Sequence, residues 1–155
     1  MTVRFVEETV ELAGRALTLL RPASADELID EEAFDEEEFL PYWAELWPSG
    51  VALARAVGAL DLRSSRVLEL GAGLGLPSLA AALGGADVLA TDWADDAVEL
   101  LRLNAGRNRI GLRAERVRWD DPAPLVRHAP WALVLDAATV GEPRAEADLR
   151  DLEVA

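Results

Sequence analysis

A short apolar run that leads into three closely spaced glycines restricts the fold of this chain more than any other feature. Residues 67–70 are Val-Leu-Glu-Leu, a composition typical of a buried strand. Gly71, Gly73 and Gly75 follow, and because they lack Cβ atoms the backbone can turn sharply and a ligand can approach it closely. Residues 76–83 then have a helix-forming composition. Strand, glycine turn and helix in this order predict the nucleotide-binding entry of a doubly wound α/β fold.

Two features of this turn narrow the class of ligand. The glycine spacing is G-x-G-x-G, which differs from the G-x-G-x-x-G of a dinucleotide fingerprint. Glu69 stands two residues before the first glycine, where a buried strand would ordinarily carry an apolar side chain. A pyrophosphate at this turn favours backbone N–H groups and no nearby anion, whereas a carboxylate would hold the ammonium group of a ligand with an amino-acid moiety. The alternative is a glycine-rich turn that binds no ligand.

Composition excludes several classes of function. The 155 residues, 51% of them apolar, suit one domain spanning residues 1–155. The chain has no cysteine, so disulfides and thiolate metal sites are excluded, and its net charge of −14 argues against a nucleic-acid partner. No apolar run approaches the ~20 residues that span a bilayer, and Glu7, Glu8 and Glu11 interrupt any signal-peptide core. We therefore expect a cytoplasmic protein without a membrane partner or a metal.

The first 40 residues predict a decoration of this domain. Residues 2–10 and 15–20 have strand composition and are separated by Ala13-Gly14, which predicts a β-hairpin. Nine of the thirteen residues from 26 to 38 are acidic. We interpret them as a solvated segment, with a surface that recruits a basic substrate as the alternative.

An aromatic cluster precedes the glycine unit. Tyr42, Trp43 and Trp47 fall within six residues, and a helix is predicted from residue 51 to residue 57. Aromatic side chains so placed are more often part of a core. Alternatively, a rigid wall around Trp47 would suit a flat purine or a sulfonium ion.

Three segments together resemble one enzyme family. They are P-Y-W-A-E-L-W-P-S-G-x-A-L-A at 41–54, V-L-E-L-G-A-G-L-G-L-P at 67–77 and T-D-W at 91–93. This combination is similar to the class I S-adenosylmethionine-dependent methyltransferases, in the branch of small protein-lysine and nicotinamide N-methyltransferase-like proteins, over about residues 2–135. The resemblance implies methyl transfer from S-adenosyl-L-methionine to a protein lysine or a small amine. An NAD-type dehydrogenase is disfavoured by Glu69 and by the glycine spacing.

The resemblance also implies a set of cofactor-binding residues. Glu69 would bind the cofactor's ammonium group, the three glycines would allow its approach, and Trp47 would form a wall. Asp92 ends a strand predicted over 86–91 and lies 21 residues after Gly71, the spacing at which a carboxylate meets ribose hydroxyls. The alternative for Asp92 is a cap for the helix predicted over 94–104.

Asp120 follows a third predicted strand at 114–119, where relatives have an acid that accepts a hydrogen bond from the adenine amino group. Turn chemistry explains Asp120 equally well, since it precedes an Asp-Pro pair. His128, the only histidine, is expected in a solvated loop.

The resemblance fails after the fourth predicted strand, at 131–135. Relatives have an aspartate and then a tyrosine there, and the matching positions here are Ala138 and Gly141, so the catalytic residue is unknown. Residues 142–155 predict a final helix, whereas a complete class I domain has seven strands.

We therefore predict a Rossmann-like α/β fold with a mainly parallel sheet, helices on both faces and an N-terminal β-hairpin, without the C-terminal strands of the full fold. The four core strands should have the order third, second, first, fourth, which leaves the fourth as an edge where copies of the chain could associate. We expect the chain to be marginally stable as a monomer, to pair with another copy, or to be a truncated or frameshifted product of a longer gene. An inactive or fragmentary cofactor-binding module is the alternative function.

Overall fold

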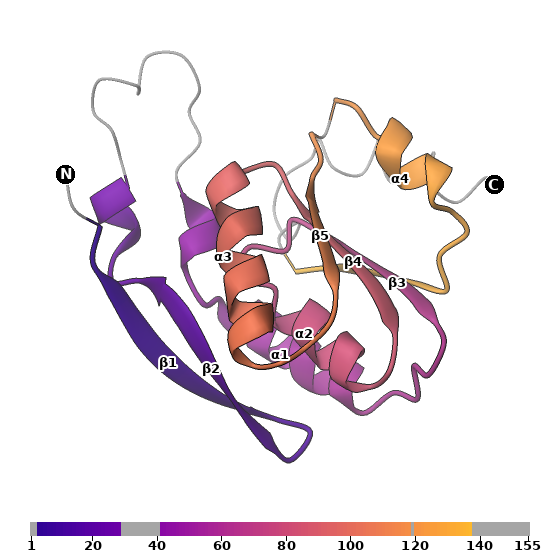
Figure 1. Cartoon of the computed structure of the whole chain (residues 1–155), viewed down its shortest axis with the longest axis horizontal. Helices are drawn as coiled ribbons and strands as arrows, with labels where there is room; N and C mark the ends of the chain where they lie inside the picture. The colour runs from indigo at the N-terminus through magenta and orange to yellow at the C-terminus, as the bar shows by residue number, and fades with distance from the viewer. Residues whose placement is uncertain (1–2, 29–40, 119, 138–155) are drawn as a thin grey trace.

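The computed structural model describes residues 3–28, 41–118 and 120–137. A two-stranded hairpin comes first, and strands and helices then alternate (Figure 1). The strands are β1 (Phe5–Leu12), β2 (Arg15–Pro22), β3 (Arg66–Leu70), β4 (Asp87–Asp92), β5 (Arg113–Arg116) and β6 (Leu133–Asp136). The α-helices are α1 (Pro48–Gly58), α2 (Leu76–Leu83), α3 (Asp95–Arg107) and α4 (Ala123–Arg127), and short 3-10 turns lie at Ala25–Leu28 and Tyr42–Ala44.

The central sheet has the strand order β5-β4-β3-β6, and every pair in it is parallel. This order confirms the prediction that the first strand of the glycine unit lies between the second and the fourth. The sheet places β3, which leads into the glycine turn, next to β4 and β6. Parallel strands that lie side by side end at the same edge of the sheet, so this order decides which residues can form a site there.

Both faces of the sheet are covered, which explains why its strands are continuously apolar. On one face, Val67 and Val88 belong to a core cluster that includes side chains of α1, α2 and the hairpin. On the other face, Leu68 and Leu89 contact Leu125 of α4. The predicted arrangement, with helices on both faces, is therefore confirmed.

The sequence missed α4, and the observed bounds of other elements, β5 and α1 among them, differ from the predicted ones. Residues 123–127 form this short helix, and His128, which was expected in a loop, is its C-terminal cap residue. The third core strand is β5, which is shorter than predicted and starts one residue earlier. The helix expected at 51–57 is longer, because Pro48 occupies its first turn, where a missing N–H costs nothing.

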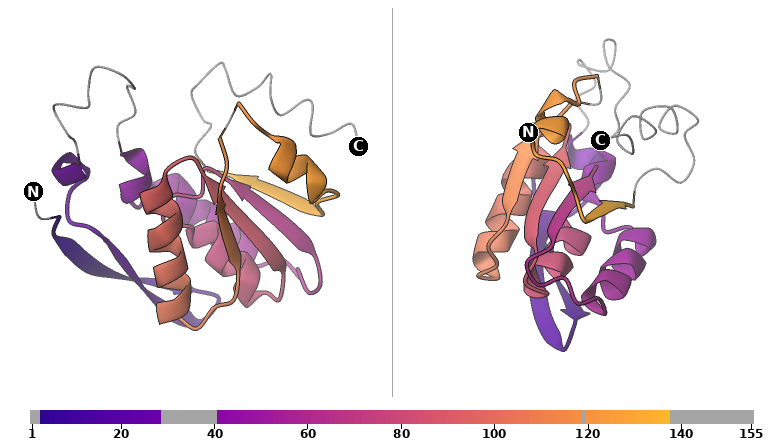
Figure 2. Two further views of the ribbon diagram at one scale, coloured as in Figure 1. Left: turned by 45° about the horizontal axis from the view of Figure 1, so that its top comes forward. Right: turned by 90° about the vertical axis from the view of Figure 1, so that its right-hand side faces the viewer.

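The N-terminal hairpin is confirmed, with Ala13 and Gly14 at its turn in left-handed backbone conformations. Its buried side chains, Val10, Leu12, Leu17 and Leu19, belong to the same core cluster as α1 and α2. Figures 1 and 2 show the hairpin alongside α3. The decoration predicted from the sequence is thus part of the core.

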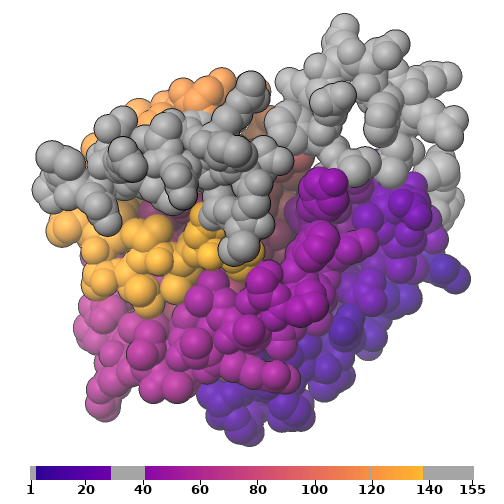
Figure 3. Space-filling model, turned by 180° about the vertical axis from the view of Figure 1, so that it is seen from behind, coloured from indigo at the N-terminus to yellow at the C-terminus, as the bar shows by residue number. Residues whose placement is uncertain are grey.

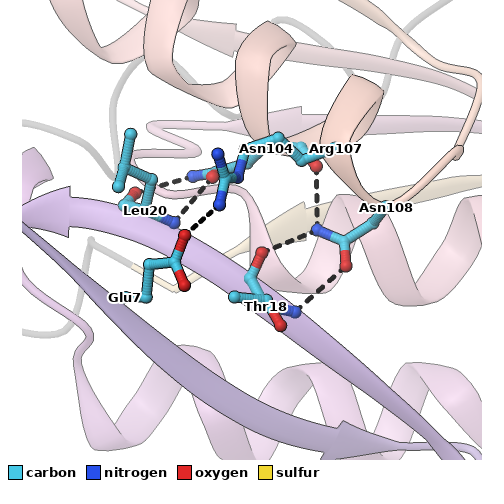
Figure 4. Close-up of polar contacts among 6 residues, drawn as sticks. All are labelled: Glu7, Thr18, Leu20, Asn104, Arg107 and Asn108. Atoms are coloured by element: carbon cyan, nitrogen blue, oxygen red, sulfur yellow. Dashed lines mark hydrogen bonds and ion pairs between the residues drawn. The ribbon is translucent and has the colours of Figure 1, made fainter.

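Side-chain amides of α3 bind the edge of β2 (Figure 4). Asn108 accepts a hydrogen bond from the Thr18 backbone N–H at 3.0 Å and donates one to the Thr18 carbonyl at 2.9 Å. One turn earlier, Asn104 makes the same pair of hydrogen bonds with Leu20, at 2.8 and 2.9 Å. An ion pair between Arg107 and Glu7 reinforces this junction. The two amides therefore satisfy the backbone groups that a further strand would otherwise pair with.

On the opposite side of the molecule, β6 is the last strand of the central sheet among the residues that the structure describes. Val134 is 42% exposed there, although it belongs to an apolar strand. Figure 3 shows the yellow end of the described chain at the surface. The edge position predicted for the fourth strand is thus observed within the described part.

Several expectations fall outside the described residues. They are the final helix at 142–155, the positions of Ala138 and Gly141, and most of the acidic segment. Within the described ranges, no helix is long and apolar enough to cross a membrane.

Replacing Asn104 with alanine should destabilise the protein by roughly 1–3 kcal/mol, because it leaves the Leu20 N–H and carbonyl without partners at a partly buried junction. Leu103→Ala is the matched control on the same helix, since Leu103 is 49% exposed, and it should cost less than about 0.5 kcal/mol. Urea denaturation measures both changes. Hydrogen exchange at the Leu20 amide should accelerate in Asn104→Ala and stay slow in the control; equal exchange rates would contradict this role.

Candidate functional site

The carboxyl ends of β3, β4 and β6 bring three acids to one edge of the sheet. Glu69 is next to the last residue of β3, while Asp92 and Asp136 end β4 and β6. In the strand register, Leu70 of β3 is paired with Asp136. Ligands of open α/β sheets bind at this edge, in the crevice beyond the strand ends. The site predicted from the glycine unit therefore lies where the fold allows one.

The glycine turn that leaves this edge needs left-handed backbone conformations. Gly71, Gly73 and Gly75 have φ values of 58°, 52° and 70°. The Gly75 N–H donates to the Ala72 carbonyl at 2.7 Å, and the Ala72 N–H donates to the Thr91 carbonyl at 2.9 Å. These hydrogen bonds fix the turn against β4.

Two of the glycines are also required by their surroundings. A Cβ atom on Gly73 would lie 3.1 Å from the carbonyl oxygen of Trp43, so the backbone of the aromatic segment lies against the turn. A Cβ atom on Gly75 would lie 2.1 Å from Cδ1 of Leu101, which belongs to α3. Gly75 is therefore required for helix packing, a reason that the sequence analysis did not give.

Glu69 is a buried carboxylate that meets the first turn of α2. It is 1% exposed, and its Oε2 accepts hydrogen bonds from the Ser78 N–H, at 2.9 Å, and from the Ser78 hydroxyl. The N-cap residue Gly75 has no side chain that could satisfy this N–H group, so the carboxylate of β3 satisfies it instead. Ser78 was not among the residues predicted for the site, and its signal in the sequence is a hydroxyl residue within an otherwise apolar helix.

Burial raises the pKa of Glu69 to about 8. The two hydrogen bonds from Ser78 oppose this increase because they stabilise the charged form, while the negative charges of Asp136 and Asp92 add to it. Glu69 is therefore mostly neutral at pH 7. A cation that came into contact with it would favour the ionised form.

Asp92 connects the glycine turn to the start of α3. It is 5% exposed; its Oδ2 accepts the Gly73 N–H at 2.8 Å, and its Oδ1 accepts the Ala94 N–H at 3.0 Å. Burial raises the pKa of this carboxyl group. Ala94 precedes the first residue of α3, and the start of this helix has no side-chain cap hydrogen bond, so Asp92 fixes the entry to α3 without acting as its cap. Its two carboxylate oxygens together offer about four acceptor sites, so a hydroxyl group could still donate to one of them.

The aromatic segment lies beside the turn, and two of its rings are exposed. Trp47 is 45% and Tyr42 is 58% exposed, so of the two alternatives for this segment, the core does not hold for these two side chains. The Trp47 indole donates to the Tyr42 carbonyl at 2.9 Å, and the two rings meet edge to face at 6.0 Å. Trp47 is therefore held in place although much of its surface is in contact with solvent.

Asp120 and His128 lie apart from this arrangement. The Asp120 side chain is 70% exposed and pairs with Arg118 at 3.0 Å, and this hydrogen bond lowers its pKa. None of its recorded hydrogen bonds joins it to Glu69, Asp92 or the glycine turn. The His128 carbonyl accepts a hydrogen bond from Arg66. Within the described ranges, no group of three or more His, Cys, Asp or Glu side chains could hold a metal ion.

Comparisons with known proteins agree on one family. Residues 33–150 match the sequence model of a family described as lysine methyltransferase. The chain is 38% identical, over 120 residues, to the electron transfer flavoprotein beta subunit lysine methyltransferase of Xenopus laevis, and 34% identical, over 104 residues, to a protein N-lysine methyltransferase of Danio rerio. These alignments cover 72% and 63% of this chain.

The chain spans about half the length of these relatives, since the alignments cover 44% and 47% of them. Among solved structures, a 16S rRNA methyltransferase of T. Thermophilus in complex with AdoMet and guanosine has a TM-score of 0.69 and 19% identity. That similarity covers 98% of this chain and 39% of the other. At this identity it establishes the fold alone.

The raised pKa of Glu69 predicts how stability depends on pH. The pKa of Glu69 is about 8 in the folded protein and about 4.5 in the unfolded chain, so the folded protein binds its proton more tightly. The resulting stabilisation of the fold is fully present below pH 4.5 and is lost as the pH rises towards 8. Glu69→Gln, which imitates the neutral acid, should remove this component, at about 1.4 kcal/mol for each pH unit of the interval. Thermal or urea unfolding at several pH values measures it. Exposed Glu99 on α3 provides the control, because Glu99→Gln should leave the slope of the wild type unchanged.

Gly75→Ala should destabilise the protein by at least about 2 kcal/mol, because alanine is strained at this φ value and its Cβ would overlap Leu101. Gly106→Ala is the control: Gly106 lies in α3 with open space around it, and the change should stabilise by about 0.4–1 kcal/mol. Shortening Leu101 to alanine in the Gly75→Ala background should cost less than it does in the wild type. Strictly additive unfolding free energies would refute the proposed overlap.

Proposed function

Because this chain belongs to the lysine methyltransferase family, we propose that it binds S-adenosyl-L-methionine and serves the transfer of its methyl group to the lysine side chain of a protein. One observation carries the proposal: a buried carboxylate, Glu69, lies at the strand end beside a turn of glycines, in a fold that binds ligands at this edge. The relatives named above are called protein lysine methyltransferases, which supports a protein acceptor. A small amine is the alternative acceptor.

The residues at this edge fit the chemical groups of the cofactor. Glu69 can hold an ammonium group, because the hydrogen bonds recorded for its carboxylate engage Oε2 alone. Asp92 can accept a ribose hydroxyl at an acceptor site that its backbone partners leave open. Gly71 and Gly73 present a backbone without Cβ atoms, and Trp47 offers an exposed aromatic face for a cation or a purine.

Asp120 remains our candidate for the residue that accepts a hydrogen bond from the adenine amino group, provided that its pairing with Arg118 allows it. Its carboxylate is already engaged by Arg118, so it must either share this partner or release it when the base binds. The pair is exposed and is therefore easily rearranged.

When bound, the cofactor supplies a methyl group on a positively charged sulfur, which a neutral amine can attack in line. The chain has to hold the reacting atoms in position and exclude water, and these two effects account for most of such catalysis. The rigid connections from Asp92 to Gly73 and from Ser78 to Glu69 suit this requirement. We assign no catalytic residue, since Ala138 and Gly141, the positions that matter in relatives, lie outside the described residues.

Binding of the ammonium group should be coupled to loss of a proton. Glu69 is mostly neutral at pH 7 in the free protein, whereas an ion pair with an ammonium group requires the carboxylate. The proton leaves to solvent as the ion pair forms. This coupling distinguishes Glu69 from an acid that is already ionised, such as Asp120.

Calorimetric titration with S-adenosylhomocysteine tests the proposal. At pH 7 the heats measured in buffers of different ionisation enthalpy should reveal the release of nearly one proton per ligand bound. Glu69→Gln should abolish this release and weaken binding by about 1.5–3 kcal/mol at pH 8.5, with a smaller loss at pH 6. Tighter binding of NAD than of S-adenosylhomocysteine, or unchanged affinity in a folded Glu69→Gln variant, would refute the assignment.

Methyl transfer requires a separate assay, because the binding of S-adenosylhomocysteine does not show catalysis. The methyltransferase activity of the longer relatives is only proposed for this chain. Incubating a lysate with the protein and methyl-labelled cofactor should label a protein band, and acid hydrolysis should then yield methylated lysine. Binding of S-adenosylhomocysteine without any labelling would support the cofactor-binding module instead.

Two further proposals concern assembly and location. Copies of the chain could associate through the edge of β6, where Val134 is exposed, and sedimentation equilibrium would detect this association. A cytoplasmic location stays a prediction from the acidic N-terminal sequence.

A further inference from the structure

The hydroxyl group of Ser78 is buried among apolar side chains, where a polar atom needs a hydrogen-bond partner. Ser78 is fully buried, and its neighbours on α2, from Leu76 to Ala81, are buried as well. A hydroxyl group in such surroundings destabilises the fold unless it forms a hydrogen bond. The partner recorded for this hydroxyl is Oε2 of Glu69, the same oxygen that accepts the Ser78 N–H at 2.9 Å.

Two donors on one oxygen restrict the carboxylate more than a single donor would. The backbone N–H alone would leave the carboxyl group free to rotate about its last bond. With the hydroxyl group added, Oε2 is held toward the start of α2, and Oε1 therefore points away from the helix. The plane of the carboxylate and the identity of its free oxygen are both set before any ligand arrives.

We propose that Ser78 is a positioning residue for cofactor recognition: it holds Oε2 of Glu69 against α2 so that Oε1 is presented to the ammonium group of the ligand. The proposal rests on the proposed function of Glu69 and adds a residue to it. Ser78 does not contact the ligand. Its influence passes through the orientation of Glu69 and through the stability of the charged form, which its hydrogen bonds favour.

The test uses Ser78→Ala, which removes the hydroxyl group and keeps the backbone N–H. Affinity for S-adenosylhomocysteine should become roughly tenfold weaker at pH 7, the effect of losing one hydrogen bond to a charged group. The pH at which affinity reaches half of its alkaline plateau should move upward, because the ionised carboxylate has lost a donor. Ser78→Cys, with a weaker donor, should give intermediate values and carries the test if Ser78→Ala does not fold.

Thr91→Val is the matched control. The Thr91 hydroxyl is buried too and donates at 2.9 Å to Glu69, but to its backbone carbonyl. Thr91→Val therefore removes a hydrogen bond that Glu69 accepts, as Ser78→Ala does, but leaves the hydrogen bonds to the Glu69 carboxylate intact. It should lower thermal stability to a similar degree and leave the pH midpoint of binding where it is in the wild type.

Combining variants separates this inference from the function on which it rests. In the Glu69→Gln background, Ser78→Ala should weaken binding by less than twofold, since there is no charged carboxylate left to orient. If Glu69→Gln weakens binding but Ser78→Ala behaves like Thr91→Val, the role of Ser78 is overturned and that of Glu69 stands. If Glu69→Gln itself binds like the wild type, the ammonium site and this inference both fail.

Discussion

The burial of one carboxyl group at the end of β3 organises the site around it. Glu69 takes the place of an apolar side chain, and this substitution is tolerated because α2 begins directly above it with an N–H and a hydroxyl group that Glu69 can accept. The glycine turn brings α2 to this place, and Asp92 fixes the turn through the Gly73 N–H. Strand, turn, helix and the neighbouring strand are thus joined by hydrogen bonds to two acids. The same burial that makes Glu69 a neutral group in the free protein makes it responsive to an incoming cation.

Much of this arrangement could be predicted from the sequence, because local patterns determine it. The apolar run before the glycines and the apolar run that ends at Asp92 predicted two strands. The family resemblance predicted the order of these and the other strands in the sheet. The docking of the hairpin could not be predicted, since Asn104 and Asn108 look like ordinary polar positions on a helix until β2 is placed beside them. The general tendency of aromatic side chains favours the core for Tyr42 and Trp47, whereas their exposure depends on how the chain enters α1. For Asp120 the neighbouring Arg118 decides its environment, and sequence spacing does not tell whether such a pair forms.

Two residues for which we propose a place in the cofactor site also have structural roles. Asp92 accepts hydrogen bonds from two backbone N–H groups, and Gly75 leaves space for Leu101. Both residues would be needed for the fold even if no cofactor bound. A glycine-rich turn with nearby acids is therefore weak support for a ligand by itself. The support becomes strong when one acid, such as Glu69, is buried at a cost that the fold alone could avoid with an apolar residue.

The amide contacts between α3 and β2 have a consequence for synthesis of the chain on the ribosome. They join residues that are 84 and 90 positions apart, so the hairpin emerges well before the helix that covers its edge. At ~5–20 residues per second, the backbone groups of Thr18 and Leu20 remain uncovered for roughly 4–18 s in each new chain. During that interval a strand edge is available to other nascent chains, and the side-chain charges of the hairpin cancel, since Glu7, Glu8 and Glu11 are matched by Arg4, Arg15 and Arg21. Electrostatic repulsion between copies therefore gives this edge little protection, and its closure depends on the later synthesis of α3.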